Sequence, residues 1–252
     1  MANREDLMII TLLTDFGTSD SYVAEMKAVL LSSAPSAVLV DISHQVAPGD
    51  IRAGQYLLGR AWTHFPRATV HLAIVDPGVG TARRALAAEH DDQRFVAPDN
   101  GLLSFLPKNA RYVSLPVPAS ASATFHGRDV FAPAAATLAM GAALEDLGES
   151  IIDPCYTPLP AARQDHLTVI GEVIYVDRFG TLVTNIPGDA VQPGARVRIE
   201  DSEAGSLRRT FRDVARGAFV AFVGSGGTVE IAVRDGSAAR MLGVGVGAEV
   251  RA

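Results

Sequence analysis

The chain has 252 residues, of which 48% are hydrophobic and 20% charged, a composition that is typical of a folded globular protein and excludes a disordered one. Its formal net charge of −6 provides no broad cationic surface for a phosphate backbone, so we expect no nucleic-acid partner. The single cysteine, Cys155, excludes an internal disulfide framework and a multi-thiolate metal site, and it fits a reducing cytoplasm.

The N-terminal part of the chain predicts alternating strands and helices. Three runs rich in Val, Ile and Leu are typical of strands covered on both faces: residues 8–13, 37–42 and 69–75. Two segments between them repeat apolar residues with helical spacing: residues 20–32 and 50–65. Each helical segment begins near an acidic residue suited to cap it, Asp20 in the first and Asp50 in the second. This order predicts an α/β domain with a mainly parallel sheet.

The start of the chain also indicates whether the protein crosses a membrane or is secreted. Residues 8–13 are far fewer than the ~20 that a membrane span requires. The charged residues before this run show no secretion signal. We therefore expect no membrane partner and a cytoplasmic protein.

The rest of the N-terminal domain and its boundary follow from shorter patterns. Residues 85–97 are typical of a hairpin and residues 130–141 of an alanine-rich helix, so we place an N-terminal α/β domain over residues 1–152. Residues 153–165 hold three prolines and little periodicity, which indicates a linker.

Residues 166–252 predict a smaller C-terminal all-β domain with a barrel-like fold. Six short β-branched segments are separated by Gly and Asp: residues 167–177, 182–186, 196–199, 207–211, 219–223 and 229–233. Short strands at this spacing are typical of a small antiparallel barrel or sandwich. A short helix is expected at residues 238–242.

Asp76, Arg83 and His126 are the candidate catalytic residues. Asp76 follows the third apolar run, and Pro77 ends the strand there, which places the carboxylate at the edge where α/β sheets bind ligands. A tight turn can return Arg83 to Asp76, which would keep the carboxylate ionised. If His126 joins them, the group can direct water at an activated electrophile, since a general base contributes only roughly 10²–10⁴-fold. A structural ion pair with an unrelated loop histidine is the alternative.

Asp15 follows the first apolar run and is a candidate for holding a ribose or another polar ligand, although it is also suited to a simple turn. Asp41, Ser43 and His44 follow the second run and, with Asp15, form the alternative of a divalent metal site. The Gly78-Val79-Gly80 segment lacks the third glycine of a dinucleotide fingerprint, so we expect no NAD.

The second domain has two polar turns. Asp177 and Asn185 lie on either side of a glycine turn, and residues 224–227 form a glycine-rich loop. Both features suit ordinary hairpins, and both suit the binding of an amino acid or a nucleobase.

Five motifs in this order resemble the S-adenosyl-L-methionine (SAM) hydrolase family, also called the SAM hydroxide adenosyltransferases, which is related to fluorinases and chlorinases. They are Thr14-Asp15-Phe16-Gly17, Asp76-Pro77-Gly78-Val79-Gly80-Thr81 with Arg83, Pro98-Asp99-Asn100-Gly101-Leu102-Leu103, Phe125-His126-Gly127-Arg128-Asp129, and Asp177-Arg178-Phe179-Gly180 with Thr184-Asn185-Ile186. The likeness runs from about residue 10 to residue 250.

The resemblance implies a fold, an assembly and a reaction. The fold is an α/β domain followed by a β-barrel domain, and the assembly is a homotrimer with inter-subunit active sites. The reaction converts SAM and water to adenosine and L-methionine by displacement at the ribose 5′ carbon. SAM is the substrate, and no cofactor or metal is expected. Halide-using relatives lack the Asp and His of the water-using enzymes, so Asp76 and His126 indicate water as the nucleophile.

The resemblance also implies roles for individual residues. Asp76, Arg83 and His126 are the catalytic set. The implied substrate-binding residues are Asp15 for the ribose, Tyr22 near the methionine end, Phe125 against the adenosine, Asp177 and Ser225 for the methionine amine and carboxylate, and Thr181, Glu230 and Val233 toward the adenine. Thr181 stands where relatives carry an asparagine, and Arg234-Asp235 replaces an uncharged pair.

Three alternatives to a SAM hydrolase stay open on the sequence. One is a protein that binds adenosine or SAM without turnover. The second is a metal-dependent hydrolase built on Asp15, Asp41 and His44. The third is a halide-using adenosyl enzyme.

Overall fold

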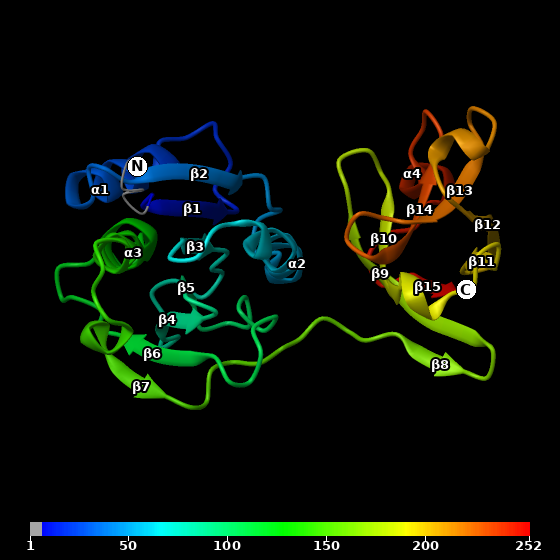
Figure 1. Cartoon of the computed structure of the whole chain (residues 1–252). Coiled ribbons are helices and arrows are strands. Elements are labelled where there is room, and N and C mark those ends of the chain that lie inside the picture. The colour runs from blue at the N-terminus through cyan, green and yellow to red at the C-terminus, as the bar shows by residue number, and fades with distance from the viewer. Residues whose placement is uncertain (1–6) are drawn as a thin grey trace, which may run out of the picture. The chain divides into compact units, whose positions relative to one another are not determined.

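The computed structural model describes residues 7–252, which form two compact units (Figure 1). The first unit ends at Pro158 and the second begins at Leu159, so the boundary lies inside the segment interpreted as a linker. Part of that segment is ordered as a strand, β8 (Arg163–Asp165), which pairs with β9 (Thr168–Val176).

The first unit is built on a seven-stranded sheet in the order β2-β1-β3-β5-β4-β6-β7. Its parallel pairs join β1 (Ile9–Thr14), β2 (Val38–Ser43), β3 (Val70–Ile74) and β5 (Gln93–Pro98). Its antiparallel pairs add β4 (Ala85–His90), β6 (Arg111–Leu115) and β7 (Glu149–Ile151). The predicted α/β fold with strands at all three apolar runs is confirmed.

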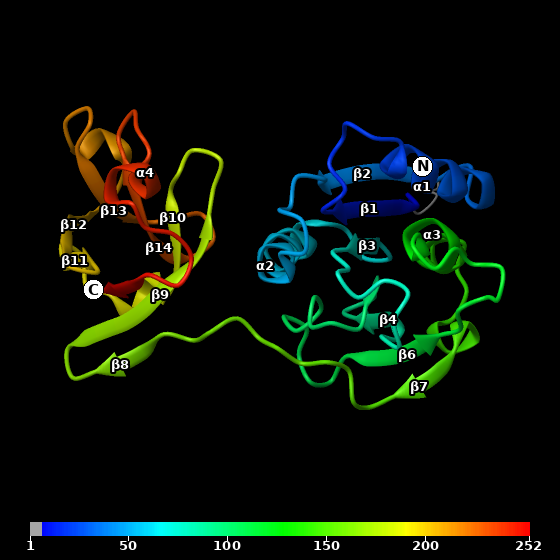
Figure 2. The ribbon, with the colours of Figure 1, turned by 180° about the vertical axis from the view of Figure 1, so that it is seen from behind.

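Helices cover both faces of this sheet. They are α1 (Tyr22–Ser33), α2 (Ile51–Ala61) with the 3₁₀ turn η1 (Trp62–His64), the π-helix η2 (Gly127–Phe131) that leads into α3 (Ala132–Ala139), and the 3₁₀ turn η3 (Leu144–Leu147). Figures 1 and 2 show α1 and α3 on one face of the sheet and α2 on the other. Between α1 and the strands, Met26 and Leu30 pack against Ile10 and Leu12 in a buried core.

The two predicted caps have different outcomes. The Asp50 side chain accepts a hydrogen bond from the backbone N of Ala53 at 2.9 Å and caps α2 as expected. The expected cap at Asp20 is wrong, because Ser21 is the residue before α1. The Ser21 hydroxyl caps nothing and donates instead to Glu25 in the first turn of the helix.

The hairpin of β4 and β5 is confirmed. Asp91 and Asp92 form its two-residue turn and have φ angles of 50° and 56°. Two consecutive positive φ values define the type I′ turn that matches the twist of paired strands, and aspartate tolerates this conformation better than most residues.

The second unit is a closed barrel. Seven strands follow the order β10-β14-β13-β12-β11-β15-β9, and pairing of β9 with β10 closes the ring, with β8 as an extra strand outside it. The remaining strands are β10 (Leu182–Pro187), β11 (Arg196–Ile199), β12 (Ser202–Arg208), β13 (Phe219–Val223), β14 (Thr228–Val233) and β15 (Glu249–Arg251). The shorter elements are α4 (Ala238–Leu242) and the 3₁₀ turns η4 (Gly188–Ala190) and η5 (Phe211–Asp213).

The barrel confirms the predicted β fold and the helix at residues 238–242, with two differences. The strand expected at residues 207–211 is β12, which begins at Ser202 and ends at Arg208. The last strand, β15, was not expected, because its three residues carry two charges and no alternating pattern.

From Leu7 onward, no helix has the length and apolar character that crossing a membrane requires.

Candidate active site

Asp76 and Arg83 form a buried ion pair just beyond the end of β3. Arg83 Nε donates to Asp76 Oδ1 at 3.0 Å and Arg83 Nη2 donates to Asp76 Oδ2 at 2.5 Å, a bidentate arrangement. Only 5% of the Asp76 side chain and 7% of the Arg83 side chain are exposed. The remaining Arg83 nitrogen, Nη1, donates to the backbone carbonyl of Arg84 at 3.1 Å. The tight turn predicted between these residues is thus present.

His126 completes this set from a different part of the chain. It lies immediately before the π-helix η2 and is 6% exposed. Its Nδ1 lies 3.2 Å from Arg83 Nη2. Because a guanidinium can only donate, Nδ1 must accept, which leaves Nε2 as the nitrogen that carries the proton of the neutral ring. The structure therefore brings the three predicted catalytic residues together.

Gly80 explains how the two loops approach so closely. Its φ is +76°, and a Cβ atom at this position would overlap the backbone oxygen of Ala123. Only glycine satisfies both conditions. The Gly78-Val79-Gly80 segment therefore has a structural role that sequence reasoning missed: it allows the loop after β3 to pack against the loop that ends at His126.

The surroundings of Asp76 act on its pKa in two directions. Burial raises the pKa of this carboxyl above its ordinary value, although Arg83 and the backbone of Gly78 act in the opposite direction. The net direction is upward because the desolvation of the buried carboxylate outweighs the attraction of the ion pair, while Arg83 limits the rise and favours the ionised form, as expected. A carboxylate with a raised pKa is the better proton acceptor.

Three aromatic rings line a cavity in the same unit. Phe16, Tyr22 and Phe125 meet edge to face, with ring centroids 5.3 Å apart for Tyr22 and Phe125 and 6.0 Å apart for the other two pairs. They border a cavity of about 430 Å³ with Glu25, Ser122, Thr124 and Arg128. Two predicted binding residues, Tyr22 and Phe125, are thus neighbours, and Phe125 is directly followed by His126.

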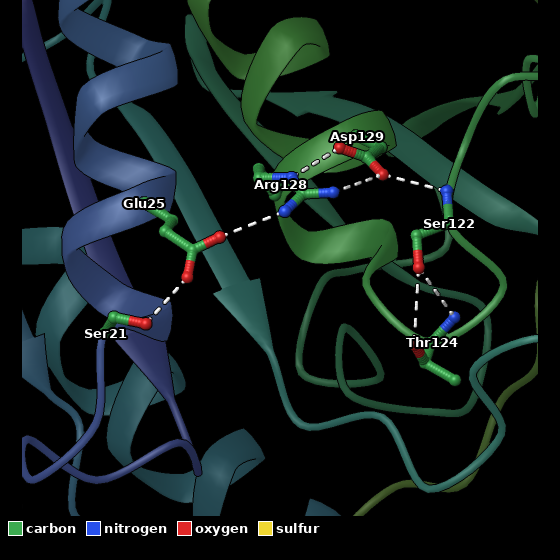
Figure 3. Close-up of polar contacts among 6 residues, drawn as sticks. All are labelled: Ser21, Glu25, Ser122, Thr124, Arg128 and Asp129. Carbon is green, nitrogen blue, oxygen red and sulfur yellow. Dashed lines mark hydrogen bonds and ion pairs between the residues drawn. The ribbon is translucent and has the colours of Figure 1, made fainter.

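Arg128 links the elements around this aromatic cavity (Figure 3). It donates from Nη1 to Glu25 of α1 at 3.0 Å and from Nε and Nη2 to Asp129 at 2.7 and 3.0 Å. Asp129 also accepts from the backbone N of Ser122 at 2.8 Å, and the Arg128 guanidinium lies 5.0 Å above the Phe125 ring. Sequence reasoning missed Arg128 as a site residue, although it is part of the Phe125–Asp129 motif.

Two of the proposed metal ligands, Asp41 and His44, lie next to each other, and Asp15 makes a different contact. Asp15 Oδ2 accepts from the backbone N of Gly49 at 2.8 Å. Asp41 pairs with Lys27 at 2.7 Å and lies 3.1 Å from His44 Nε2, and His44 Nδ1 lies 2.8 Å from the Thr14 hydroxyl. Within residues 7–252, no group of three His, Cys, Asp or Glu side chains is placed to hold a metal ion.

The five predicted residues of the second unit converge on one hollow of about 1130 Å³: Asp177, Thr181, Ser225, Glu230 and Val233. Asp177 Oδ1 accepts from the backbone N of Phe179 at 2.9 Å and of Thr181 at 2.8 Å, which orders the turn between β9 and β10. The other polar candidate, Asn185, has a structural role, because it donates to the Pro160 carbonyl at 2.9 Å and accepts from Glu172 N at 2.8 Å.

Comparison with known proteins identifies relatives along nearly the whole chain. Family models of the N-terminal and C-terminal domains of SAM hydroxide adenosyltransferase match residues 10–148 and 171–251. An (R)-S-adenosyl-L-methionine hydrolase from Thermus thermophilus is 43% identical over 95% of this chain and 97% of its own length. A fluorinase from Nocardia brasiliensis is 28% identical over 96% of each chain. The crystal structure of a conserved protein from Thermotoga maritima, 38% identical, superposes with a TM-score of 0.89 over 96% of this chain and 98% of that one.

Proposed function

The chain belongs to the SAM hydroxide adenosyltransferase family, and from that premise we propose that it hydrolyses S-adenosyl-L-methionine to adenosine and L-methionine. The relative from Thermus thermophilus, which carries the name of this hydrolase, matches almost the entire chain. The observation in the structure that carries the proposal is the convergence of Asp76, Arg83 and His126 in a buried group.

In the proposed reaction, water attacks the ribose 5′ carbon of SAM. A C–O bond forms as the C–S bond breaks, and the bonding electron pair moves to the positively charged sulfur, which leaves as the neutral thioether of methionine. One proton of the water passes to Asp76 Oδ. The sulfonium supplies the activated electrophile, so the protein needs to contribute only positioning and general base catalysis.

The three catalytic residues have different tasks in this proposal. Asp76 accepts a hydrogen bond from the water and stabilises the positive charge that develops on it. His126 can donate a hydrogen bond to the water from Nε2–H, because its Nδ1 already accepts one from Arg83. Arg83 is a positioning residue that holds both side chains in place. A buried carboxylate beside the nucleophile repels halide ions, which favours water over the halide used by fluorinases.

The remaining predicted residues bind substrate in this proposal. The first unit contributes Asp15 to the ribose hydroxyls and the apolar rings of Tyr22 and Phe125. The hollow of the second unit binds the methionine amine and carboxylate through Asp177 and Ser225 and the adenine through Thr181, Glu230 and Val233. The proposal also includes a homotrimeric assembly, a cytoplasmic location and a reaction without metal or cofactor.

Incubation of the purified protein with SAM tests the function. We expect adenosine and methionine in equal amounts by chromatography, at a rate that EDTA does not change. Binding of adenosine without product formation would instead favour a non-catalytic SAM-binding protein. Loss of activity in EDTA that is restored by a divalent metal would favour the metal-dependent alternative.

A further inference from the structure

The hollow of the second unit is rich in arginine. Six arginines line it, against three carboxylates, those of Asp177, Glu230 and Asp235. The arginines are Arg178, Arg209, Arg212, Arg216, Arg234 and Arg240. The chain as a whole has a net charge of −6, so this concentration of positive charge is local.

SAM does not account for this charge. The substrate carries a sulfonium and an ammonium group and only one carboxylate, so it is itself a cation. An excess of guanidinium groups attracts anions, and the one carboxylate of SAM is too little negative charge to match six arginines. The arginine set therefore indicates a second class of ligand.

Two of the six arginines make contacts with other protein groups beside the hollow. Arg216 pairs with Asp235 at 3.0 Å, and Arg234 donates to the backbone carbonyl of Val214 at 2.8 Å. These contacts attach the segment that follows β12 to the end of β14. Each contact uses a donor of one guanidinium nitrogen, Nε of Arg216 and Nη1 of Arg234.

The other four arginines are different. Within the described part of the chain, the guanidinium groups of Arg178, Arg209, Arg212 and Arg240 donate no hydrogen bond and form no ion pair. Each guanidinium offers five donors in a planar fork that matches the oxygens of a phosphate.

Arg209 and Arg212 are presented by an ordered turn. The Asp213 carboxylate accepts hydrogen bonds from the backbone N of Arg209 at 3.1 Å and of Thr210 at 3.0 Å. Phe211, between the two arginines, packs against Phe222 with ring centroids 4.7 Å apart. Because the backbone is already fixed, binding an anion here orders only the arginine side chains.

The hollow also has aromatic surface for a base. Phe179, whose side chain is 76% exposed, and Phe211 both line it. Exposed aromatic rings next to arginines suit a ligand that combines a nucleobase with phosphates.

We propose that this hollow binds adenine nucleoside polyphosphates, with Arg209 and Arg212 contacting the phosphates. The inference rests on the proposed function, because that function places the adenosine group beside Val233 and Thr181 in the same hollow. A nucleotide bound there competes with SAM, so adenine nucleotides act as competitive inhibitors of hydrolysis.

Calorimetry on the full chain tests the inference with ATP, adenosine and inorganic tripolyphosphate as ligands. We expect ATP to bind at least ~10-fold more tightly than adenosine, since each charge-assisted contact to phosphate strengthens binding severalfold or more. We also expect the ATP affinity to fall steeply with salt concentration. An ATP affinity equal to that of adenosine would overturn the proposal, and so would tripolyphosphate binding as tightly as ATP, because the site would then select only negative charge.

Two double variants test whether Arg209 and Arg212 contact the phosphates. Arg209→Ala/Arg212→Ala should weaken ATP binding at least ~10-fold and leave the adenosine affinity within about twofold, which also shows that the hollow is intact. Arg196→Ala/Arg198→Ala removes the same charge from exposed positions of β11 and should leave both affinities within about twofold. Equal losses of ATP affinity in the two variants would overturn the proposal.

A hydrolysis assay separates this inference from the proposed function. Adenosine formation from SAM in a preparation that binds no ATP overturns the inference alone. Arginine-dependent ATP binding in a preparation that never forms adenosine supports the nucleotide site and overturns the hydrolase.

Discussion

Arg83 Nη2 donates to His126 Nδ1 at 3.2 Å and thereby joins two loops whose residues are 43 positions apart in the sequence. The same nitrogen donates to Asp76 Oδ2 at 2.5 Å, so one guanidinium orients both the carboxylate and the imidazole. This shared contact is the structural basis for assigning the base to Asp76 and a hydrogen-bond donor to His126.

Asp76→Asn should abolish most of the activity. The amide is nearly the same size as the carboxylate but accepts no proton from water, so kcat should fall by roughly 10²–10⁴-fold, while KM for SAM changes little. Asp153→Asn is a suitable control, because its side chain is 75% exposed and pairs with Arg84 instead. Adenosine formation by Asp76→Asn within tenfold of the unsubstituted rate would contradict the role of this residue.

The pH profile should reveal the same carboxyl group. Burial raises the pKa of Asp76 above its ordinary value near 3.8, and only the deprotonated form accepts a proton. The value of kcat/KM should therefore fall on the acid side, with a midpoint above pH 3.8. The residual activity of Asp76→Asn should lack this acid limb, and an acid limb of equal midpoint in the variant would assign the titration to another group.

Arg128→Met should weaken substrate binding more than it slows the chemical step. The methionine side chain fills a similar volume, but it loses the hydrogen bonds to Glu25 and Asp129 and the cation above Phe125. We expect KM to rise severalfold, with a smaller change in kcat. Arg67→Met serves as the control, because Arg67 is 78% exposed and pairs with Asp92 at the hairpin. Equal KM values for the two variants would remove Arg128 from the site.

Gly80→Ala should disturb both stability and activity. The new Cβ would meet the Ala123 carbonyl and would force a residue with φ of +76° into strain. We expect a loss of about 1–3 kcal/mol in the free energy of unfolding, and a fall in kcat of up to ~10²-fold because Asp76 and His126 move apart. Gly141→Ala, with φ of +96° and open space around it, should show the strain alone and a normal kcat. A normal kcat in Gly80→Ala would contradict this coupling.

The lowered pKa of His71 predicts how the stability of the protein depends on pH. Burial lowers its pKa to about 4, against an ordinary value of 6.5, while its contact with Gln93 opposes this shift. The unfolded chain therefore binds a proton that the native chain excludes, so the free energy of unfolding should decrease by about 3 kcal/mol as the pH falls from 7 to 4. Urea denaturation of His71→Gln should show a weaker pH dependence. His166→Gln, at a 98% exposed position, should keep the original slope, and an unchanged slope in His71→Gln would contradict the assignment.

Local rules predicted much of the fold but little of its long-range packing. The cap at Asp50 and the turn at Asp91 and Asp92 depend on neighbouring residues, and both were predictable. The short strands β7 and β15 contain three residues each, too few for a periodic signal, and they exist because a neighbouring strand offers hydrogen bonds.

The candidate site shows the same division. The pairing of Asp76 with Arg83 follows from a short turn, whereas spacing in sequence gives no distance between Arg83 and His126. That contact depends on Gly80 approaching Ala123, a tertiary feature. The direction of the Asp76 pKa shift also required the structure, because it depends on how deeply the carboxyl is buried.

The source of the oxygen in the product tests the central claim most directly. The protein would be incubated with SAM in water enriched in ¹⁸O, and the adenosine analysed by mass spectrometry. If Asp76 and His126 direct water to the 5′ carbon, the 5′ hydroxyl of adenosine carries the heavy isotope and the Asp76→Asn variant forms almost none of this product. Adenosine that contains only the light isotope, or equal amounts of labelled adenosine from the variant, would contradict the proposed mechanism.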